Sequence, residues 1–211
     1  MERTYDENIM PVKLGITGGV GSGKSLVCSY LKGKGLTVVS ADDLSRNAVL
    51  PGTAAYKGIV DYFGNDILLD DNTLNRSKLR DIITKDKNKK EVLEQFVHPE
   101  VFVQMDLEYQ KSVKRHDSVI AVEVPLLFET GIEAFFDYIL TVSVKPDVRV
   151  ARVMARDKVT QKEAEALMKI QMPEEEKIKK SDFVIDNNGP VNTTQNLIDR
   201  FYEKFMNKIE K

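Results

Sequence analysis

The chain has little of what several classes of protein require. It contains one cysteine in 211 residues, which excludes intrachain disulfides and zinc sites built from several thiolates. Its 31 lysines and arginines against 33 aspartates and glutamates leave a net charge of −2, whereas a dedicated nucleic-acid-binding protein carries a basic excess. No apolar run approaches the roughly 20 residues of a membrane span. Residues 1–10 are polar and acidic, unlike a signal peptide, so we expect a flexible tail over residues 1–11 and a cytoplasmic location.

What remains is the composition of one sizeable globular core, with 42% hydrophobic and 30% charged residues. Short strand-like runs, mostly β-branched and almost continuously apolar, recur between helical patterns. Such runs are typical of parallel strands that are covered on both faces. The alternation therefore predicts an α/β fold with a doubly wound, parallel five-stranded sheet. The predicted strands are Val12–Thr17, Leu36–Ser40, Ser118–Val124, Tyr138–Val144 and Asp182–Asp186.

A glycine-rich stretch directly follows the first predicted strand and precedes a helical run. It matches the pattern G-x-x-x-x-G-K-[ST], with Gly18, Gly23, Lys24 and Ser25 at the fixed positions. Glycines let the backbone curl so that its N–H groups point at phosphate oxygens, and the following helix adds the positive end of its dipole. The lysine reaches the β- and γ-phosphates, and the serine hydroxyl ligates Mg²⁺. The stretch predicts a nucleotide-phosphate site formed by Gly19, Val20, Gly21, Ser22, Gly23, Lys24, Ser25 and Leu26.

The interval between the second and third predicted strands is too long for a loop. Pro51-Gly52-Thr53 opens a helix that Gly64 ends, and Pro99 restarts a second helical pattern further on. A crossover of this size is an all-helical insertion, which can form a second wall for a substrate. We assign residues 51–113 to this insertion, and residues 12–50, 114–146 and 181–211 to the nucleotide-binding core.

After the fourth predicted strand, a new helix carries Arg149, Arg152 and Arg156 at offsets of three and four, so they share one face. This stripe either neutralises charge on a transferred phosphoryl group or forms a solvated, salt-bridged face. The capping box Thr160-x-x-Glu163 then starts another helix. A basic stripe followed by a short helical hairpin predicts a lid over residues 147–180, whose closure excludes water.

Two carboxylates follow predicted strands, at the edge where open α/β sheets bind ligands. Asp42 comes two residues after the second strand, and either accepts the proton of an attacking hydroxyl or caps the next helix. Arg46 lies one helical turn further on, as a partner of this site or as a solvated arginine. Glu123 ends the third strand, and either holds Mg²⁺ through water or makes an ordinary hydrogen bond at the strand end.

Other residues are candidates for substrate contact. His98, directly before Pro99, is either a substrate contact or a structural residue of a helix end. The apolar run Pro125-Leu126-Leu127 follows Glu123, which places it near the rim of the predicted site; packing in the core is the alternative.

Taken in order, these residues resemble the dephospho-CoA kinase family. The resemblance extends from Lys13 to Asn187. Many NTPases share the phosphate loop, but the ordered set of motifs is specific. The matching motifs are Gly15-Ile-Thr-Gly-Gly-Val-Gly-Ser-Gly-Lys-Ser25, Ala41-Asp42 with Arg46, Pro51-Gly52, Phe63-Gly64, His98-Pro99, Pro125-Leu-Leu-Phe-Glu129, Arg152-x-x-x-Arg156-Asp157 and Asp182-x-x-Ile-Asp-Asn187.

The resemblance implies a P-loop kinase core with a helical CoA-binding part and a lid. It implies an enzyme that uses ATP and Mg²⁺ to phosphorylate the ribose 3′-hydroxyl of dephospho-CoA, giving CoA and ADP. No nucleic-acid or membrane partner is expected, and monomer and weak homo-oligomer stay open. The implied roles are catalysis for Asp42, Lys24 and Arg152, nucleotide binding for Arg156 and Asn187, substrate binding for Asp42, Arg46, His98, Pro125, Leu126 and Leu127, and metal binding for Ser25 and Glu123.

Two positions depart from the family pattern. Ser40 stands where many members have a second aspartate, so Asp42 is the only carboxylate of that motif, and Leu167 replaces an arginine that often precedes the position of Gln171. A nucleoside monophosphate kinase shares the fold, but it phosphorylates a phosphate and needs no base. A GTPase needs an N-K-x-D base-reading motif, which the chain lacks. A module that only binds ATP is disfavoured by the intact set of Lys24, Ser25, Asp42 and Arg152.

Overall fold

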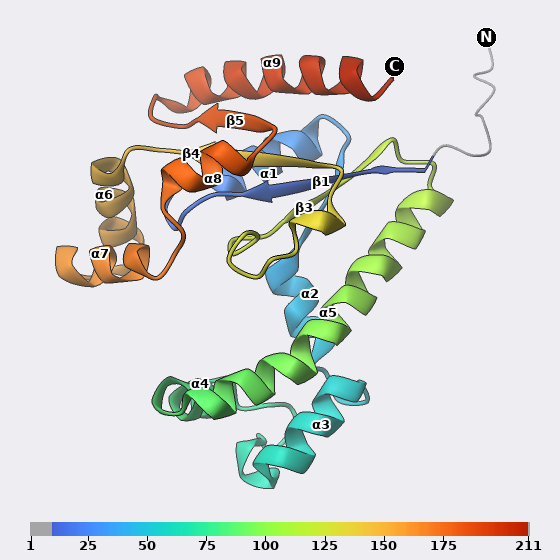
Figure 1. Cartoon of the computed structure of the whole chain (residues 1–211), viewed down its shortest axis with the longest axis vertical. Coiled ribbons are helices and arrows are strands. Elements are labelled where there is room, and N and C mark those ends of the chain that lie inside the picture. Colours follow the sequence, from blue (N-terminus) through green and yellow to red (C-terminus); the bar gives the residue numbers. More distant parts are fainter. Residues whose placement is uncertain (1–9, 211) are drawn as a thin grey trace. The chain divides into compact units, whose positions relative to one another are not determined.

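The computed structural model describes residues 10–210, and the chain divides into two compact units (Figure 1). The larger unit consists of residues 1–39 and 112–211, and the smaller one of residues 40–111. Most of the predicted tail, residues 1–9, lies outside the described residues. No helix within residues 10–210 is long and apolar enough to cross a membrane. The roles assigned to the core, insertion and lid segments stay predictions.

A five-stranded sheet in the order β2-β3-β1-β4-β5 carries the larger unit. The central strand β1 pairs in parallel with β3 on one side and β4 on the other, and β4 pairs in parallel with β5. The chain starts at the central strand, reaches β2 at one edge, returns through β3, and then crosses to β4 and β5 on the other side of β1, as in a doubly wound sheet. The predicted fold class is therefore confirmed, and all five strands lie within a residue of their expected ends. They are β1 (Val12–Thr17), β2 (Thr37–Ser40), β3 (Val119–Glu123), β4 (Tyr138–Ser143) and β5 (Phe183–Asp186).

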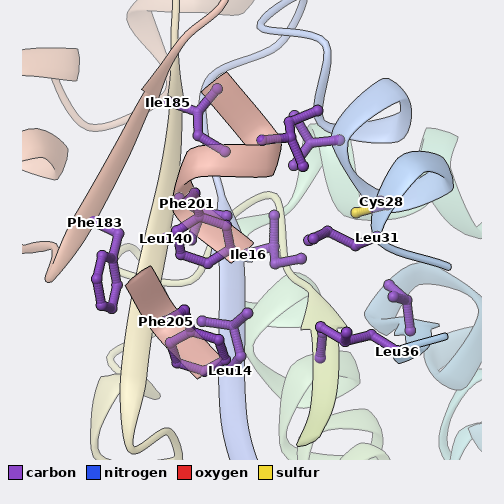
Figure 2. Close-up of a cluster of buried hydrophobic side chains, with 14 of the residues drawn as sticks. Leu14, Ile16, Cys28, Leu31, Leu36, Leu140, Phe183, Ile185, Phe201 and Phe205 are labelled. Atoms are coloured by element: carbon purple, nitrogen blue, oxygen red, sulfur yellow. The ribbon is translucent and has the colours of Figure 1, made fainter. Parts of the chain in front are cut away.

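One face of the sheet packs against two helices, α1 (Lys24–Gly33) and α9 (Val191–Ile209). Figure 2 shows Leu14 and Ile16 of β1 among Leu31 of α1 and the Phe201 and Phe205 rings of α9. Those two rings stack with their centroids 5.4 Å apart. The apolar stripe of α9 at helical spacing is thus core packing, and α9 runs alongside β5 (Figure 1).

Gly15 lies on the face of β1 opposite to Leu14 and Ile16. A Cβ at Gly15 would lie 2.7 Å from the Leu127 side chain and 3.0 Å from the ring of Phe136. Both of those side chains are buried, so they occupy the space that a larger residue would need. A short 3-10 helix, η2 (Glu133–Phe135), directly precedes Phe136.

Three further helices of the larger unit begin at a proline or at the predicted capping box. In α6 (Pro146–Asp157) a proline stands at the first helical position, where its missing N–H costs nothing. The capping box is present at the start of α7 (Gln161–Lys169): Thr160 N donates to the Glu163 carboxylate at 2.8 Å, and Glu163 N donates back to Thr160 Oγ1. Pro173 precedes α8 (Glu174–Lys180).

The smaller unit is helical around its own apolar core. Thr53 caps α3 by accepting from Tyr56 N at 3.1 Å, and Gly64 ends that helix with a φ of 81°, as predicted. The buried side chains of Ile59, Ile67, Leu74 and Leu79 form the core. The elements are α2 (Ala41–Ala48), α3 (Ala54–Phe63), the 3-10 helix η1 (Asn65–Ile67), α4 (Arg76–Lys85) and α5 (Lys87–Lys114), of which α5 continues into the larger unit.

The expectation that Pro99 restarts the helical pattern is wrong. Helix α5 runs unbroken through Pro99 for 28 residues. A proline inside a helix removes one hydrogen bond and crowds the carbonyl four residues earlier. Here Gln95, His98 and Pro99 are all exposed, so water can bond the carbonyl that Pro99 leaves unpaired. The long runs of intrahelical bonds on either side then outweigh the local cost.

Candidate active site

The glycine-rich loop spans the six residues between the end of β1 and the start of α1. Gly21 and Gly23 have φ values of 77° and 89°, a left-handed conformation that glycine adopts without strain. Gly23 is the N-cap of α1 and has no side chain to offer the helix. The local sequence therefore folds into the predicted strand, loop and helix.

The inner side of this loop presents unpaired backbone donors. Among residues 10–210, the N–H groups of Gly21, Gly23, Lys24 and Ser25 have no acceptor, while Ser22 N is used by Gly19 O at 3.1 Å. Unpaired N–H groups at a helix start carry partial positive charge and bind anions. This part of the loop has the donors that a chain of phosphates requires.

The outer side of the loop is tightly packed. A Cβ at Gly18 would overlap the Val142 carbonyl, and one at Gly19 would overlap the Arg149 guanidinium. A Cβ at Gly23 would likewise overlap the side-chain amide of Asn187. The absence of side chains at these glycines therefore allows close packing behind the loop, in addition to the curvature of the loop.

Lys24 is folded over the loop that precedes it. Its Nζ donates to Gly18 O at 2.9 Å and to Gly19 O at 3.3 Å, and its side chain is buried. Burial lowers the pKa of this ammonium group, and the nearby Glu123 carboxylate offsets only part of that effect. In the part of the chain that the structure describes, the hydrogen-bond acceptors of this buried cation are two carbonyl oxygens, so it is well placed to pair with a phosphate.

Glu123 is brought to the same place by the sheet. It ends β3 opposite Ile16 of β1, and its carboxylate interacts with both Lys24 and the Cys28 thiol. Burial, reinforced by Glu123, raises the pKa of Cys28 to about 12, so this thiol is the inert, buried residue that its position in α1 predicts. Ser25, next to Lys24, is exposed. The described residues contain no cluster of three or more His, Cys, Asp or Glu side chains that could hold a metal by themselves.

The three arginines of α6 have three different environments. Arg149 is only 5% exposed; it pairs with Glu174 at 2.8 Å and donates through Nε to Val20 O at 3.1 Å. Arg156 is exposed and paired with Asp157 at 2.7 Å. Arg152 donates through Nη2 to Asn187 O at 2.9 Å, while its buried Nη1 has no partner among the described residues. Of these three arginines, Arg152 is the one with a buried guanidinium nitrogen that lacks an acceptor within residues 10–210.

Asn187, predicted to contact nucleotide, has its side-chain amide engaged elsewhere. Its Nδ2 donates to Ser22 O at 2.7 Å and its Oδ1 accepts from Thr194 Oγ1 at 2.7 Å. The residue is buried and braces the phosphate loop from behind. Of the predicted substrate contacts in this unit, Leu126 is exposed and Pro125 is half-buried. Leu127 is fully buried against Gly15, so its side chain has no free surface for a substrate.

The sequence alone does not identify several polar residues of this site. Lys177 is 1% exposed, pairs with Glu129 at 2.8 Å and donates to Pro125 O at 3.4 Å. Glu129 also accepts from Met172 N at 2.8 Å. Burial by itself raises the pKa of Glu129, but the hydrogen bonds from Lys177 and Met172 outweigh it, and the pKa lies below its ordinary value. The glutamates and lysines of α8 lie within a few positions of one another, and this local pattern gives no sign of a pair with Glu129, 48 residues earlier in the chain.

The smaller unit holds the other predicted site residues. Helix α2 begins at Ala41 and its N-cap is Ser40, so the alternative that Asp42 caps the helix is wrong: Asp42 lies exposed in the first turn. Arg46 bonds Asp43, not Asp42, at 3.2 Å, with both side chains 66% exposed. His98 is exposed on α5.

The chain is similar to several known proteins over most of its length. A family model described as dephospho-CoA kinase matches residues 12–193. A dephospho-CoA kinase from Listeria innocua serovar 6a is 42% identical over 194 residues, which cover 92% of this chain and 97% of that protein. The crystal structure of TT1252 from Thermus thermophilus matches with a TM-score of 0.78 at 31% identity, covering 94% and 97% of the two chains. A dephospho-CoA kinase from Campylobacter jejuni has the same fold, with a TM-score of 0.71 at 24% identity over 92% and 96%.

Proposed function

Since this chain belongs to the dephospho-CoA kinase family, we propose that it transfers the γ-phosphoryl group of ATP to the ribose 3′-hydroxyl of dephospho-CoA. The products are CoA and ADP, and the reaction is the final step of coenzyme A biosynthesis. The observation that carries the proposal is the set of hydrogen-bond donors gathered around the glycine loop. These are the N–H groups that have no acceptor within residues 10–210, the buried Lys24 ammonium that bonds two loop carbonyls, and Nη1 of Arg152, which has no partner there.

In the proposed reaction, the loop holds the phosphates of ATP through its backbone. Lys24 leaves the carbonyls of Gly18 and Gly19 for the β- and γ-phosphates and stabilises the charge that develops during transfer. Arg152 approaches the same phosphates with Nη1, while its Nη2 stays on Asn187 O. Both groups are donors held in a buried environment, where electrostatic stabilisation is stronger than in water.

The family also implies Mg²⁺, and the residues present fit it. Ser25 supplies an exposed hydroxyl at the start of α1, and Glu123 supplies a carboxylate beside Lys24. A metal held by these residues would neutralise part of the charge on the phosphates. We propose Ser25 as a direct ligand and Glu123 as a contact through water.

Asp42 is the proposed general base. As the ribose oxygen forms its bond to the γ-phosphorus, the bond from phosphorus to the leaving oxygen of ADP breaks, and the hydroxyl proton passes to the Asp42 carboxylate. The motif match that assigns this role also assigns Arg46, His98, Pro125 and Leu126 to the substrate, whereas the buried Leu127 supports this segment from the core. Residues 147–180 are the proposed lid; with Leu167 in place of an arginine, Arg152 and Arg156 are the family-motif arginines that this segment contributes.

An acceptor assay tests the proposal. The full chain is incubated with Mg²⁺ and ATP together with dephospho-CoA, AMP, CMP or no acceptor, and ADP formation is measured. We expect ADP to form rapidly with dephospho-CoA alone, with CoA produced in equal amount. Turnover of AMP or CMP instead indicates a nucleoside monophosphate kinase. ATP binding without turnover of any acceptor indicates a binding module, and either result refutes the proposed function.

A further inference from the structure

We propose that Gln171 is a positioning residue for the phosphate loop, and that it withholds the Val20 N–H from the bound nucleotide. The proposal rests on the proposed function, because it concerns how the same loop is preset for ATP. Gln171 lies in the connection between α7 and α8, 151 residues from Val20 along the chain. Its side-chain Oε1 accepts a hydrogen bond from Val20 N at 2.8 Å.

Val20 is held at its carbonyl as well as at its N–H. Arg149 Nε donates to Val20 O at 3.1 Å, and Arg149 Nη2 lies 3.4 Å from the same Gln171 oxygen. Arg149 and Gln171 therefore act as one acceptor–donor pair that grips both backbone groups of a single loop residue. Such a grip fixes the orientation of the two peptide planes that flank Val20.

The grip is anchored to the rigid sheet. Arg149 is buried and pairs with Glu174 Oε2 at 2.8 Å, and the other oxygen of Glu174 accepts from Val144 N at 2.6 Å. Val144 directly follows β4. The chain of contacts thus runs from the end of a central strand through Glu174 and Arg149 to Val20.

The N–H groups of the loop therefore fall into two sets, those that are already hydrogen-bonded and those that are available to the nucleotide. Val20 N is occupied by Gln171 and Ser22 N by Gly19 O, whereas the N–H groups of Gly21, Gly23, Lys24 and Ser25 are unpaired among residues 10–210. The N–H groups left to the phosphates are then the ones that Gln171 helps to aim. Because an amide oxygen is neutral, Gln171 does this without placing a negative charge beside the phosphates.

The first test measures exchange of individual amide protons by NMR in the absence of nucleotide. In the unsubstituted protein we expect the Val20 amide to exchange at least tenfold more slowly than the Gly21 amide. Gln171→Met keeps the size of the side chain but removes the acceptor, and it should abolish this protection. Gln171→Glu keeps an acceptor and should preserve it. Equal exchange of Val20 and Gly21 in the unsubstituted protein overturns the proposal, even if the methionine variant fails to fold.

The second test separates ATP binding from turnover. Loss of one hydrogen bond should weaken binding of Mg²⁺-ATP to Gln171→Met about three- to tenfold by calorimetry, with kcat at saturating ATP within twofold. The matched control is Gln161→Met, because the exposed amide of Gln161 bonds Glu165 within the same helix, α7. This variant should bind ATP normally. Unchanged or tighter ATP binding by Gln171→Met overturns the proposal, since Val20 N–H would then be available to the phosphates. Calorimetry needs no acceptor, so this result is independent of whether dephospho-CoA is the substrate.

Discussion

Asp42 and Asp43 are adjacent residues with different surroundings. Asp43 is paired with Arg46 at 3.2 Å, whereas the Asp42 carboxylate has no hydrogen-bond or ion-pair partner in the described part of the chain. Neither is the N-cap of α2, so neither is needed to start that helix. An unpaired carboxylate is available to accept a proton, and its neighbour serves as a control for charge and position.

Asp42→Asn should lower turnover about 10²- to 10⁴-fold, because the amide cannot accept the hydroxyl proton. ATP affinity and melting temperature should stay close to those of the unsubstituted protein, since the phosphate loop is untouched and no cap is lost. Asp43→Asn should retain nearly full turnover. Steady-state kinetics of both variants test the role of Asp42. If the turnover of Asp42→Asn stays within tenfold of normal, Asp42 is not the general base and that role is unassigned.

The sequence predicts the local structure of the site where the residues that determine it lie within a few positions of one another. The loop from Gly18 to Ser25 carries its own turn, donors and cation, so its sequence alone predicts its shape. Gln171, Glu174 and Lys177 could not be found in this way, because their partners lie 22 to 151 residues away. Arg149 was expected on a catalytic or solvated face, but its partners make it a buried support of the loop.

At the scale of elements, the spacing of apolar residues predicts the strands and helices, and capping residues predict where several helices begin. Local patterns fail where a tertiary contact decides. Helix α5 continues through Pro99 because its intrahelical bonds outweigh one proline. The sequence of α8 is highly charged, a pattern that is typical of a surface helix. In the structure this helix buries Lys177 against Glu129, and these contacts join the connection after α7 to the segment after β3.

This buried pair predicts an asymmetric effect on stability. Lys177→Met should lower the free energy of unfolding by about 1–3 kcal/mol, because the partly exposed Glu129 carboxylate loses its ammonium partner and keeps the hydrogen bond from Met172 N. The double change Glu129→Leu with Lys177→Met should cost less than the single one, since it removes both charges.

Urea denaturation of the single and double variants measures these free energies. Lys179→Met is the matched control, because Lys179 is an exposed lysine of the same helix, and its effect should stay within about 0.5 kcal/mol. A double variant that is less stable than Lys177→Met contradicts the argument.

For the whole molecule, the sequence predicted a sheet core and a helical insertion, and the structure has two compact units. The first residues of the smaller unit, 40–50, were expected to belong to the nucleotide-binding core. Sequence periodicity defines each element but not which elements pack together, because packing depends on side chains that are distant along the chain. Unit boundaries are therefore harder to predict than strands.

The single cysteine makes global opening of the larger unit measurable. At pH 8 a thiol with a pKa of about 12 is thiolate to an extent of only about 10⁻⁴, and Cys28 is also buried. We expect a disulfide reagent such as DTNB to label the native protein at least a hundredfold more slowly than the protein in guanidinium, where one equivalent should react. Saturating Mg²⁺-ATP should slow native labelling further, since the ligand stabilises the folded state. Rapid labelling of native protein contradicts the burial of Cys28.

The packing behind the phosphate loop has an evolutionary consequence. Side chains at Gly18, Gly19 and Gly23 would overlap the Val142 carbonyl, Arg149 and Asn187, none of which belongs to the nucleotide. A descendant of this protein that lost its catalytic base, and with it all selection for phosphoryl transfer, would still unfold or rearrange on replacing these glycines. The glycine signature would therefore outlive the activity. In lineages of this fold, the survival of Asp42 together with Lys24 is a better record of retained catalysis than the glycines themselves.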